Sequence, residues 1–146
     1  MIAFGADVVQ SCAEASGREW LETNGRGSYA MGTAAGAAIR RYHGLLTAAV
    51  RPPVRRVQIV NRLEETLVVD GKRFLLSCQT YDGALPPDGL PWLREFRLDP
   101  FPVWIIEAGG MRIKKSFFLR YGEDTAVVLY EHVSGPAAAL EARPLL

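Results

Sequence analysis

The side chains best suited to chemistry are concentrated at Arg40, Arg41, Tyr42 and His43, just before an apolar stretch. A histidine can donate or accept a hydrogen bond, and a tyrosine offers a flat apolar ring together with a phenol. The two arginines add donors of fixed geometry. His43 has three open interpretations: a satisfied structural residue, a contact to a ligand or a second domain, or direct proton transfer, for which the sequence offers no partner. A nucleophilic triad is not supported, because no serine or cysteine stands with acid partners at a recognisable spacing.

Three further polar or aromatic residues, Asn24, Arg26 and Tyr29, lie in a glycine-rich segment upstream of the first cluster. Asn24-Gly25 predicts a tight turn, since glycine adopts positive φ without steric cost. The segment contains neither the Walker A pattern nor the GxGxxG pattern, so it does not predict a phosphate-cradling loop. We therefore expect a structured loop of another kind.

A basic segment, Arg51-Pro52-Pro53-Val54-Arg55-Arg56, places three arginines around a Pro-Pro corner. Such a loop can contact the phosphates of nucleic acid. The chain as a whole is close to neutral, however, with seventeen Lys and Arg against sixteen Asp and Glu, and it carries no recognisable nucleic-acid-reading motif. We expect no nucleic-acid partner. The prolines predict a turn between a strand that ends near Val50 and another that begins near Arg56.

The composition is that of an ordinary soluble globular domain. The 146 residues suit one domain, 49% of them are hydrophobic, and the formal net charge is only +1. Cys12 and Cys78 are the two cysteines, and we predict that both are free thiols, as in a reducing compartment. The sequence shows neither a signal peptide nor an apolar run long enough for a membrane helix. We expect a cytoplasmic protein without a metal site, a cofactor or a membrane partner.

Short β-rich runs separated by turn signals follow one another from residue 54 onward and predict antiparallel sheets. A hairpin is expected to join Thr66–Val69 to Arg73–Ser77 through Asp70-Gly71. Residues 85–89 predict a loop, and a helical turn is indicated only over Gly36–Arg41. Further strands are expected at Val57–Val60, Trp92–Leu98, Val103–Glu107, Met111–Leu119 and Thr125–Val133.

The pattern within two of these strands predicts which side chains share a face. Alternation over Trp92–Leu98 places four residues on one face: Trp92, Arg94, Phe96 and Leu98. The core face of Met111–Leu119 is expected to carry Met111, Ile113, Phe117 and Leu119. Lys115 and Phe118 break the alternation in that strand.

Several ordered blocks of the sequence resemble one known family. They are WLETNGRGSYAMGT, RRYHGLLTAAVRPPVRRV, RLEETLVVDG, DPFPVW, GEDT and LEARPLL. This pattern is similar to the N-terminal domain of bacterial and archaeal glycogen debranching enzymes of the amylo-α-1,6-glucosidase type. The resemblance implies an all-β fold, an antiparallel β-sandwich of the supersandwich type over residues 18–146, preceded by a lead-in or first strand over residues 1–17. It also implies a separate helical (α/α)6 barrel that carries the glycoside hydrolase chemistry.

The same resemblance implies a role for the two polar clusters. Loops of such a β-domain can lie against the mouth of the barrel, where they would help to bind an α-glucan such as glycogen. The substrate-binding residues expected on this basis are Asn24, Arg26, Tyr29, Arg40, Arg41, Tyr42 and His43. Ser28 departs from the family pattern, which usually has a second glycine there, and serine adopts positive φ only at a cost.

Glycoside hydrolysis needs two carboxyl groups on either side of one bond. Glu64 and Glu65 are the most conspicuous pair, but on a strand their side chains point to opposite faces. We expect one of them to be solvated and the other to pair with Arg62 or with a neighbouring strand. No residue is therefore predicted to be catalytic, and the chain alone is expected to be inactive.

Two other functions remain open from the sequence. A freestanding carbohydrate-binding module would stack sugar rings on exposed aromatic side chains, with Trp20, Trp92 and Trp104 as the candidates. A self-association domain would form a homodimer through an open sheet edge. Such an edge is expected because an apolar segment begins at Ala137–Leu140 and the sequence ends a few residues later, at Leu146, which would leave an unpaired strand. We interpret that ending as a fragment of a longer protein, whose expected partners are α-glucan and the catalytic domain.

Overall fold

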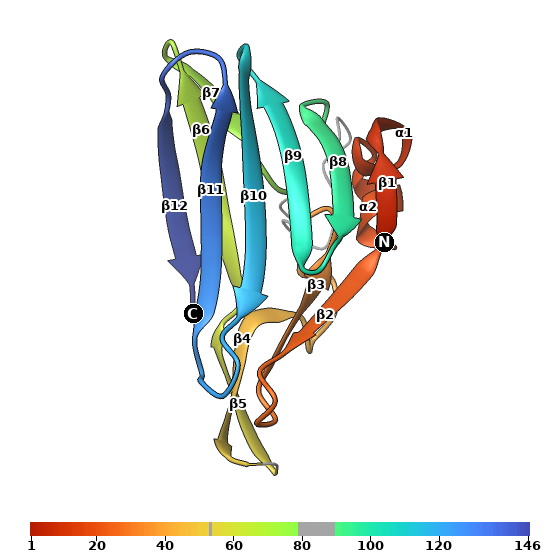
Figure 1. Cartoon of the computed structure of the whole chain (residues 1–146), viewed down its shortest axis with the longest axis vertical. Coiled ribbons are helices and arrows are strands. Elements are labelled where there is room, and N and C mark those ends of the chain that lie inside the picture. The colour runs from red at the N-terminus through yellow and green to blue at the C-terminus, as the bar shows by residue number, and fades with distance from the viewer. Residues whose placement is uncertain (53, 79–89) are drawn as a thin grey trace.

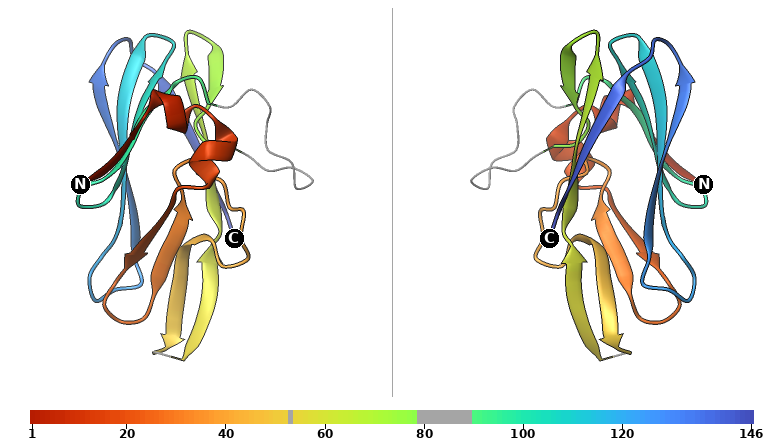
Figure 2. Two further views of the ribbon diagram at one scale, coloured as in Figure 1. Left: turned by 90° about the vertical axis from the view of Figure 1, so that its right-hand side faces the viewer. Right: turned by 90° about the vertical axis from the view of Figure 1, so that its left-hand side faces the viewer.

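The computed structural model describes residues 1–52, 54–78 and 90–146. It is built mainly from antiparallel strands that form two facing layers (Figures 1 and 2). One layer is a five-stranded sheet, made of β1 (Ile2–Gly5), β8 (Leu93–Leu98), β9 (Pro102–Ala108), β10 (Met111–Leu119) and β11 (Ala126–Ser134) in that order. The predicted all-β antiparallel sandwich is confirmed.

The second layer consists of two smaller sheets that meet at Asn61. One contains β2 (Glu19–Thr23), β3 (Tyr29–Thr33), β4 (Gly44–Arg51) and β5 (Arg55–Val60), and the other contains β12 (Ala139–Leu145), β6 (Arg62–Val69) and β7 (Lys72–Leu75). The N–H of Asn61 donates to the carbonyl of Leu145 in the three-stranded sheet (2.8 Å). Its own carbonyl accepts from the N–H of Leu45 in the four-stranded sheet (3.2 Å). A single residue thus links the two ladders.

Two short helices, α1 (Ala6–Val9) and α2 (Cys12–Ser16), follow β1. Ser11 caps α2, since its Oγ accepts from the N–H of Glu14 (3.3 Å), and the serine and glutamate have the spacing of a capping box. The helical turn predicted over Gly36–Arg41 is wrong, because this segment is irregular. Gly36 has a positive φ of 70°, which a right-handed helix does not allow.

The core between the layers is built around four aromatic rings. Trp20 lies 6.0 Å from Trp104 and 5.1 Å from Phe117, and Phe96 lies 5.2 Å from Trp104, between ring centroids. The indole N–H of Trp104, on β9, donates to the carbonyl of Ala34 in the other layer (2.8 Å). Because Trp20 and Trp104 are buried in this cluster, the prediction that they are exposed for stacking is wrong.

Trp92 does not take the predicted exposed position either. It is partly buried and packs edge-on against Phe74 of β7, with the ring centroids 5.8 Å apart. A register shift between Leu93 and Glu95 also breaks the alternation of β8. Arg94 therefore points to Glu107 on the outer face, whereas Phe96 is buried, so the single face predicted for this strand is wrong.

Other predicted elements are confirmed. β6 and β7 form the expected hairpin, with Asp70 and Gly71 at positive φ values of 48° and 75°. β9, β10 and β11 form the expected meander, and β10 buries its predicted core face. β4 ends at Arg51 and β5 begins at Arg55, within one residue of the expected turn. The loop predicted at 85–89 lies outside the described residues.

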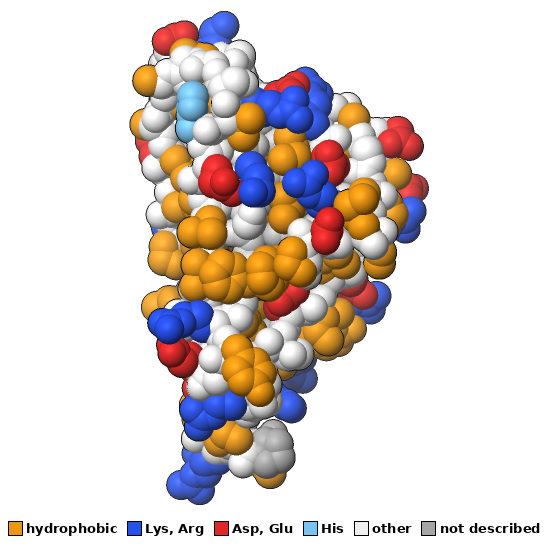
Figure 3. All heavy atoms as spheres, in the orientation of Figure 1, with side chains coloured by type: hydrophobic (Ala, Val, Ile, Leu, Met, Phe, Trp, Pro, Cys, Tyr) orange, Lys and Arg blue, Asp and Glu red, His pale blue; other side chains and the backbone are white. Residues whose placement is uncertain are grey.

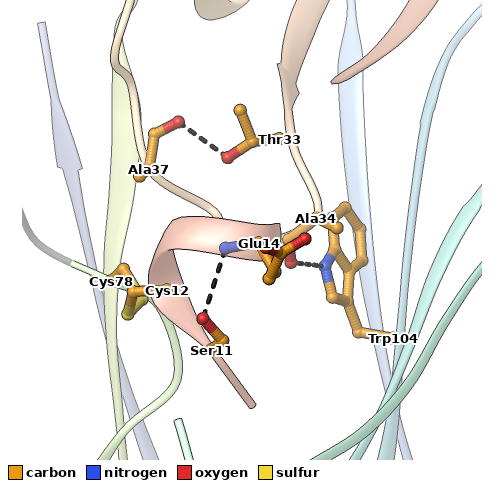
Figure 4. The surroundings of a disulfide bond; sticks show 8 residues. All are labelled: Ser11, Cys12, Glu14, Thr33, Ala34, Ala37, Cys78 and Trp104. Atoms are coloured by element: carbon orange, nitrogen blue, oxygen red, sulfur yellow. Dashed lines mark hydrogen bonds between the residues drawn. A yellow bond between two sulfur atoms is a disulfide. The ribbon is translucent and has the colours of Figure 1, made fainter. Parts of the chain in front are cut away.

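Cys12 and Cys78 form a disulfide between α2 and the segment that follows β7 (Figure 4). The prediction of two free thiols is wrong, because it relied on sequence separation. The cysteines are 66 positions apart, yet their Cα atoms are 6.1 Å apart. The N–H of Cys78 donates to the carbonyl of Ala35 (2.9 Å), which holds this segment beside α2. Because the two cysteines are not free thiols, they no longer indicate a reducing compartment.

In the part of the chain that the structure describes, no helix is both long and apolar enough to cross a membrane.

We predict that reducing the disulfide destabilises the fold. Because it closes a loop between residues 66 positions apart, the chain-entropy account gives a loss of about 4 kcal/mol in the free energy of unfolding. Urea denaturation with and without dithiothreitol measures this loss. The double variant Cys12→Ser, Cys78→Ser should show the lower stability in both conditions. An identical midpoint for the wild type with and without reductant would contradict the prediction.

Candidate functional site

One buried side chain fastens the turn between β2 and β3 to the turn between β10 and β11. The Nδ2 of Asn24 donates to the carbonyl of Glu123 (2.9 Å) and to Oδ1 of Asp124 (3.1 Å). Its Oδ1 accepts from the backbone N–H groups of Arg26 (2.8 Å) and Ser28 (3.1 Å). Asn24 is fully buried, and all four hydrogen bonds that its amide can make are formed inside the protein. Its role in the site is therefore to hold the turn.

Ser28 extends this fastening to β4. Its buried hydroxyl donates to Oδ1 of Asp124 (2.5 Å) and accepts from the N–H of Ala49 (2.8 Å). Gly25 and Gly27 take the positive φ values of the turn, 76° and 96°, and Ser28 takes none. Serine at position 28 is therefore compatible with the turn, and its hydroxyl adds a contact that a glycine lacks.

His43 is the last residue of the loop that joins β3 to β4. Its side chain is buried, and both of its ring nitrogens form hydrogen bonds. Its Nδ1 accepts from the N–H of Ile39 (3.2 Å), which in the neutral ring places the proton on Nε2. That nitrogen donates to Oε1 of Glu19 (2.9 Å). Arg40 donates to the same oxygen from Nε (2.5 Å). Of the three interpretations of His43, the geometry favours the structural one.

Glu19 supplies the negative charge to which Arg40 and His43 donate. Burial by itself would raise the pKa of Glu19, but the hydrogen bonds from Arg40 and His43 and the charge of Arg40 lower it below its usual value. The ionised carboxylate holds residues 40 and 43 at one oxygen. Tyr42 lies between Arg41 and His43 in the same loop and is half exposed at the surface (48%).

A groove of about 490 Å³ lies over the outer face of β2 and β3, beside this loop. Leu21 pairs with Met31 across the two strands, and their side chains form an apolar part of the lining. Tyr29 and Tyr42 also line the groove, and the hydroxyl of Tyr29 donates to the carbonyl of Tyr42 (3.2 Å). Two aromatic side chains that lie thirteen positions apart in sequence are thus brought together.

Arg56 of β5 also lines the groove. Its Nε donates to the carbonyl of Gly27 (2.8 Å), and its guanidinium carbon lies 5.9 Å from the centre of the Tyr29 ring. This distance is within the range of a cation–π contact. Among the described residues, no aspartate or glutamate lines the groove, and the one charged side chain in this lining is the cation Arg56.

The structure brings only part of the predicted site together. The groove contains Tyr29 and Tyr42, while Arg26 and Arg41 are exposed. Three predicted residues hold the neighbouring turn and loop instead: Asn24, Arg40 and His43. Seven of the described lining residues were not predicted, among them Leu21, Met31 and Arg56. Alternation along Leu21 and Thr23 could have indicated the first, but the pairing with Met31 and the approach of β5 depend on tertiary structure.

Glu64 and Glu65 lie on opposite faces of β6, as predicted. Glu65 is buried and accepts from Nζ of Lys115 on β10 (2.6 Å) and from the hydroxyl of Tyr130. Burial, and then the charge of Glu65, raises the pKa of Tyr130 well above its usual value. Glu64 is not solvated as expected, since it pairs with Arg62 and Arg143.

Two other hollows are less suited to a sugar. The first, between the layers beside Trp20 and Trp104, has a volume of about 30 Å³. That volume suits water molecules and is too small for a sugar ring. The second, of about 420 Å³, lies on the three-stranded sheet and is lined by charged side chains that pair with one another, such as Arg73 with Glu141. The groove beside Tyr42 is therefore the candidate binding site.

Comparison with known proteins gives one family. The model of the family described as glycogen debranching enzyme N terminal matches residues 18–146. No curated protein and no solved structure matches the chain.

Replacing Asn24 by alanine is predicted to lower the free energy of unfolding by about 3 kcal/mol, because the buried donors and acceptors around it lose their partners. Chemical denaturation followed by tryptophan fluorescence measures the change. Arg26→Ala, in the same turn but exposed, is the matched control and should change stability by less than about 1 kcal/mol. Equal stabilities of the two variants would contradict the role assigned to Asn24.

The lowered pKa of Glu19 predicts a contribution to stability that depends on pH. A carboxyl group with a lower pKa in the folded state stabilises the fold above its unfolded value, here 4.5, and this contribution is lost as pH falls through the folded value. We expect the free energy of unfolding of Glu19→Gln to fall less steeply below pH 4.5 than that of the wild type. Urea titrations at a series of pH values test this, and parallel profiles would contradict it.

Proposed function

Because the chain belongs to the glycogen debranching enzyme N-terminal family, we propose that it is the non-catalytic β-sandwich domain of such an enzyme. In this proposal it takes part in α-glucan breakdown by holding the substrate, while a separate helical-barrel domain hydrolyses the α-1,6 bond. The match over residues 18–146 is the observation that carries the proposal.

The arrangement of the carboxylates supports a non-catalytic role. Hydrolysis of a glycosidic bond needs two carboxyl groups that face one bond. Glu64 and Glu65 point to opposite faces of β6, and each is engaged in ion pairs. None of the described residues that line the groove is a carboxylate. The amylo-α-1,6-glucosidase activity of the whole enzyme is therefore assigned in this proposal to the partner domain.

The groove is the proposed glucan contact. Its volume of about 490 Å³ lies within the usual range for small-molecule sites, roughly 300–1,000 Å³. Tyr29 and Tyr42 offer aromatic surface, and Leu21 and Met31 offer apolar surface, against which the C–H faces of sugar rings can pack. Tyr42 is the more exposed of the two tyrosines and the one most open to a ligand.

The catalytic domain is the second proposed partner. The outer face of the five-stranded sheet carries paired basic and acidic side chains and a band of hydrophobic ones (Figure 3). Phe101 and Phe118 stack on this face with their ring centroids 5.1 Å apart, and Leu129 of β11 is half exposed. Exposed apolar surface of this kind is typical of a face that meets another domain.

Two alternatives follow from specific observations. A freestanding carbohydrate-binding module would use the same tyrosines, since Trp20 and Trp104 are buried. A homodimer would use a sheet edge, because β5 and β11 each pair on one side only. A molar mass that rises with concentration in sedimentation experiments would favour the homodimer. Saturable glucan binding by the isolated chain, without any catalytic domain as a partner, would favour the module.

The cytoplasm is the proposed location, on the basis of the family's role in glycogen metabolism. The disulfide does not support this location, because disulfides are rare in cytosolic proteins.

We predict that Tyr42→Ala weakens binding of maltoheptaose about tenfold, the effect of losing one aromatic contact of roughly 1–1.5 kcal/mol. Isothermal titration calorimetry of the 146-residue chain measures the dissociation constant. Phe101→Ala, which removes an exposed aromatic ring that is not among the described lining residues, is the matched control and should bind like the wild type. Equal weakening in both variants, or no weakening in either, would remove the groove from the binding site.

A further inference from the structure

The basic residues of the chain are distributed unevenly. Residues 24–63 contain seven arginines and neither aspartate nor glutamate, whereas the rest of the chain carries ten Lys and Arg against sixteen acidic residues. Within this segment, Arg40 and Arg62 pair with Glu19 and Glu64 from outside it. The net charge of +1 therefore conceals a strongly basic region that consists mainly of β3, β4, β5 and their loops.

The other five arginines of this segment form no ion pair with any residue in the described ranges: Arg26, Arg41, Arg51, Arg55 and Arg56. Arg51 and Arg55 are register partners across the β4–β5 hairpin, a placement in which like charges repel. On the five-stranded sheet, by contrast, Arg94 and Arg112 share Glu107. The basic region thus has cations that the described residues do not neutralise.

The groove at the edge of this region is better supplied with donors than with acceptors. As far as the structure describes the lining, it contains no carboxylate and no side-chain amide, the guanidinium of Arg56 can only donate, and the hydroxyl of Ser28 is already engaged with Asp124 and Ala49. The carbonyl of Gly27 already accepts from Arg56, and the hydroxyl of Tyr29 donates to a backbone carbonyl. The hydroxyls of a neutral sugar need acceptors as well as donors. A phosphate monoester presents acceptor oxygens and a negative charge, which suit this lining better.

We propose that the groove binds α-glucan chains that carry phosphate monoesters in preference to neutral chains. The proposal rests on the proposed function, because Tyr29 and Tyr42 are taken to hold the sugar rings. Arg56 meets the phosphate, for which the planar guanidinium fork is well suited. Arg51 and Arg55 add attraction over a longer range, which salt screens.

Nucleic acid also carries phosphate, but the site fits it less well. Proteins that bind duplex DNA commonly neutralise about six to ten phosphates along an extended surface. Among the described residues, Arg56 is the one cation that lines the groove, and the rest of the lining is uncharged. A single phosphate beside two sugar-sized aromatic contacts is the arrangement that this groove matches.

The test is a set of calorimetric titrations of the 146-residue chain at low ionic strength. The probes are maltoheptaose, maltoheptaose with one phosphate monoester on a glucose O6, inorganic phosphate, and a twelve-residue oligothymidylate. We expect the phosphorylated maltoheptaose to bind about tenfold or more tightly than the neutral one, the gain typical of one charge-assisted hydrogen-bonded pair. The ratio of the affinities for phosphorylated and neutral maltoheptaose should fall at high salt concentration, because salt screens the attraction between arginine and phosphate.

Two substitutions of one residue sharpen the test. Arg56→Gln should bring the ratio of the two affinities close to one, and Arg56→Lys should keep part of the preference, because lysine retains the charge without the fork. Lys72→Gln, which removes an exposed cation from β7, is the matched control and should leave the ratio unchanged. Thermal unfolding of each variant verifies that it is folded.

The outcomes separate this proposal from the one on which it rests. Equal affinity for neutral and phosphorylated maltoheptaose overturns the phosphate preference and leaves glucan binding intact. Inorganic phosphate that binds as tightly as the phosphorylated chain also overturns it, because the sugar then contributes nothing. Tighter binding of the oligothymidylate than of either glucan overturns it in favour of nucleic acid. Absence of binding by both glucans overturns the phosphate preference and the glucan contact together.

Discussion

The candidate site depends on a single buried amide. Asn24 joins the turn after β2 to the turn after β10, so that one end of the second layer is held against the five-stranded sheet. Without this link, the positions of Gly27 and Ser28 would not be fixed, and Arg56 and β4 would lose the atoms to which they donate. The groove is therefore shaped by residues that do not line it, and its geometry follows from the contact between the two layers.

A second polar interaction crosses the layers near their centre. Lys115 of β10 and Glu65 of β6 face each other in the interior, and Lys115 also lies over the ring of Trp104, 4.9 Å from its centroid. A buried ion pair is weak support for stability by itself, because desolvation offsets most of its attraction. Its value here is specificity of register, because slipping either strand by one residue would leave one of the two charges buried alone.

Local signals predicted much of the fold. The Asp70-Gly71 turn and the meander of β9, β10 and β11 follow from residues that permit positive φ between runs of alternating apolar residues. The break of alternation at Lys115 was visible in the sequence, but its cause, Glu65 fifty positions away, was not. The disulfide escaped prediction for the same reason, since the distance between two cysteines is set by the packing of elements and not by their spacing along the chain.

The site was less predictable than the fold. Tyr29 and Tyr42 were identified, but three of the other five predicted residues hold a turn or loop; two of these, Asn24 and His43, are buried polar side chains that must satisfy their own hydrogen bonds. Arg56 was predicted to begin a strand after the Pro-Pro turn, and only the pairing of β5 with β4 shows that it reaches the groove. Sequence pattern indicates the faces of a strand, whereas the wall of a groove is contributed by whichever strand lies next to it.

Asn61 gives the second layer a property that neither of its sheets has alone. Since its N–H belongs to one ladder and its carbonyl to the other, β5 and β6 behave as one long strand with a bend at this residue. β5, which carries Arg56, continues through Asn61 into β6, and β6 pairs with β12. The candidate groove and β12 are thus connected by continuous backbone and one strand pairing, although they belong to different sheets.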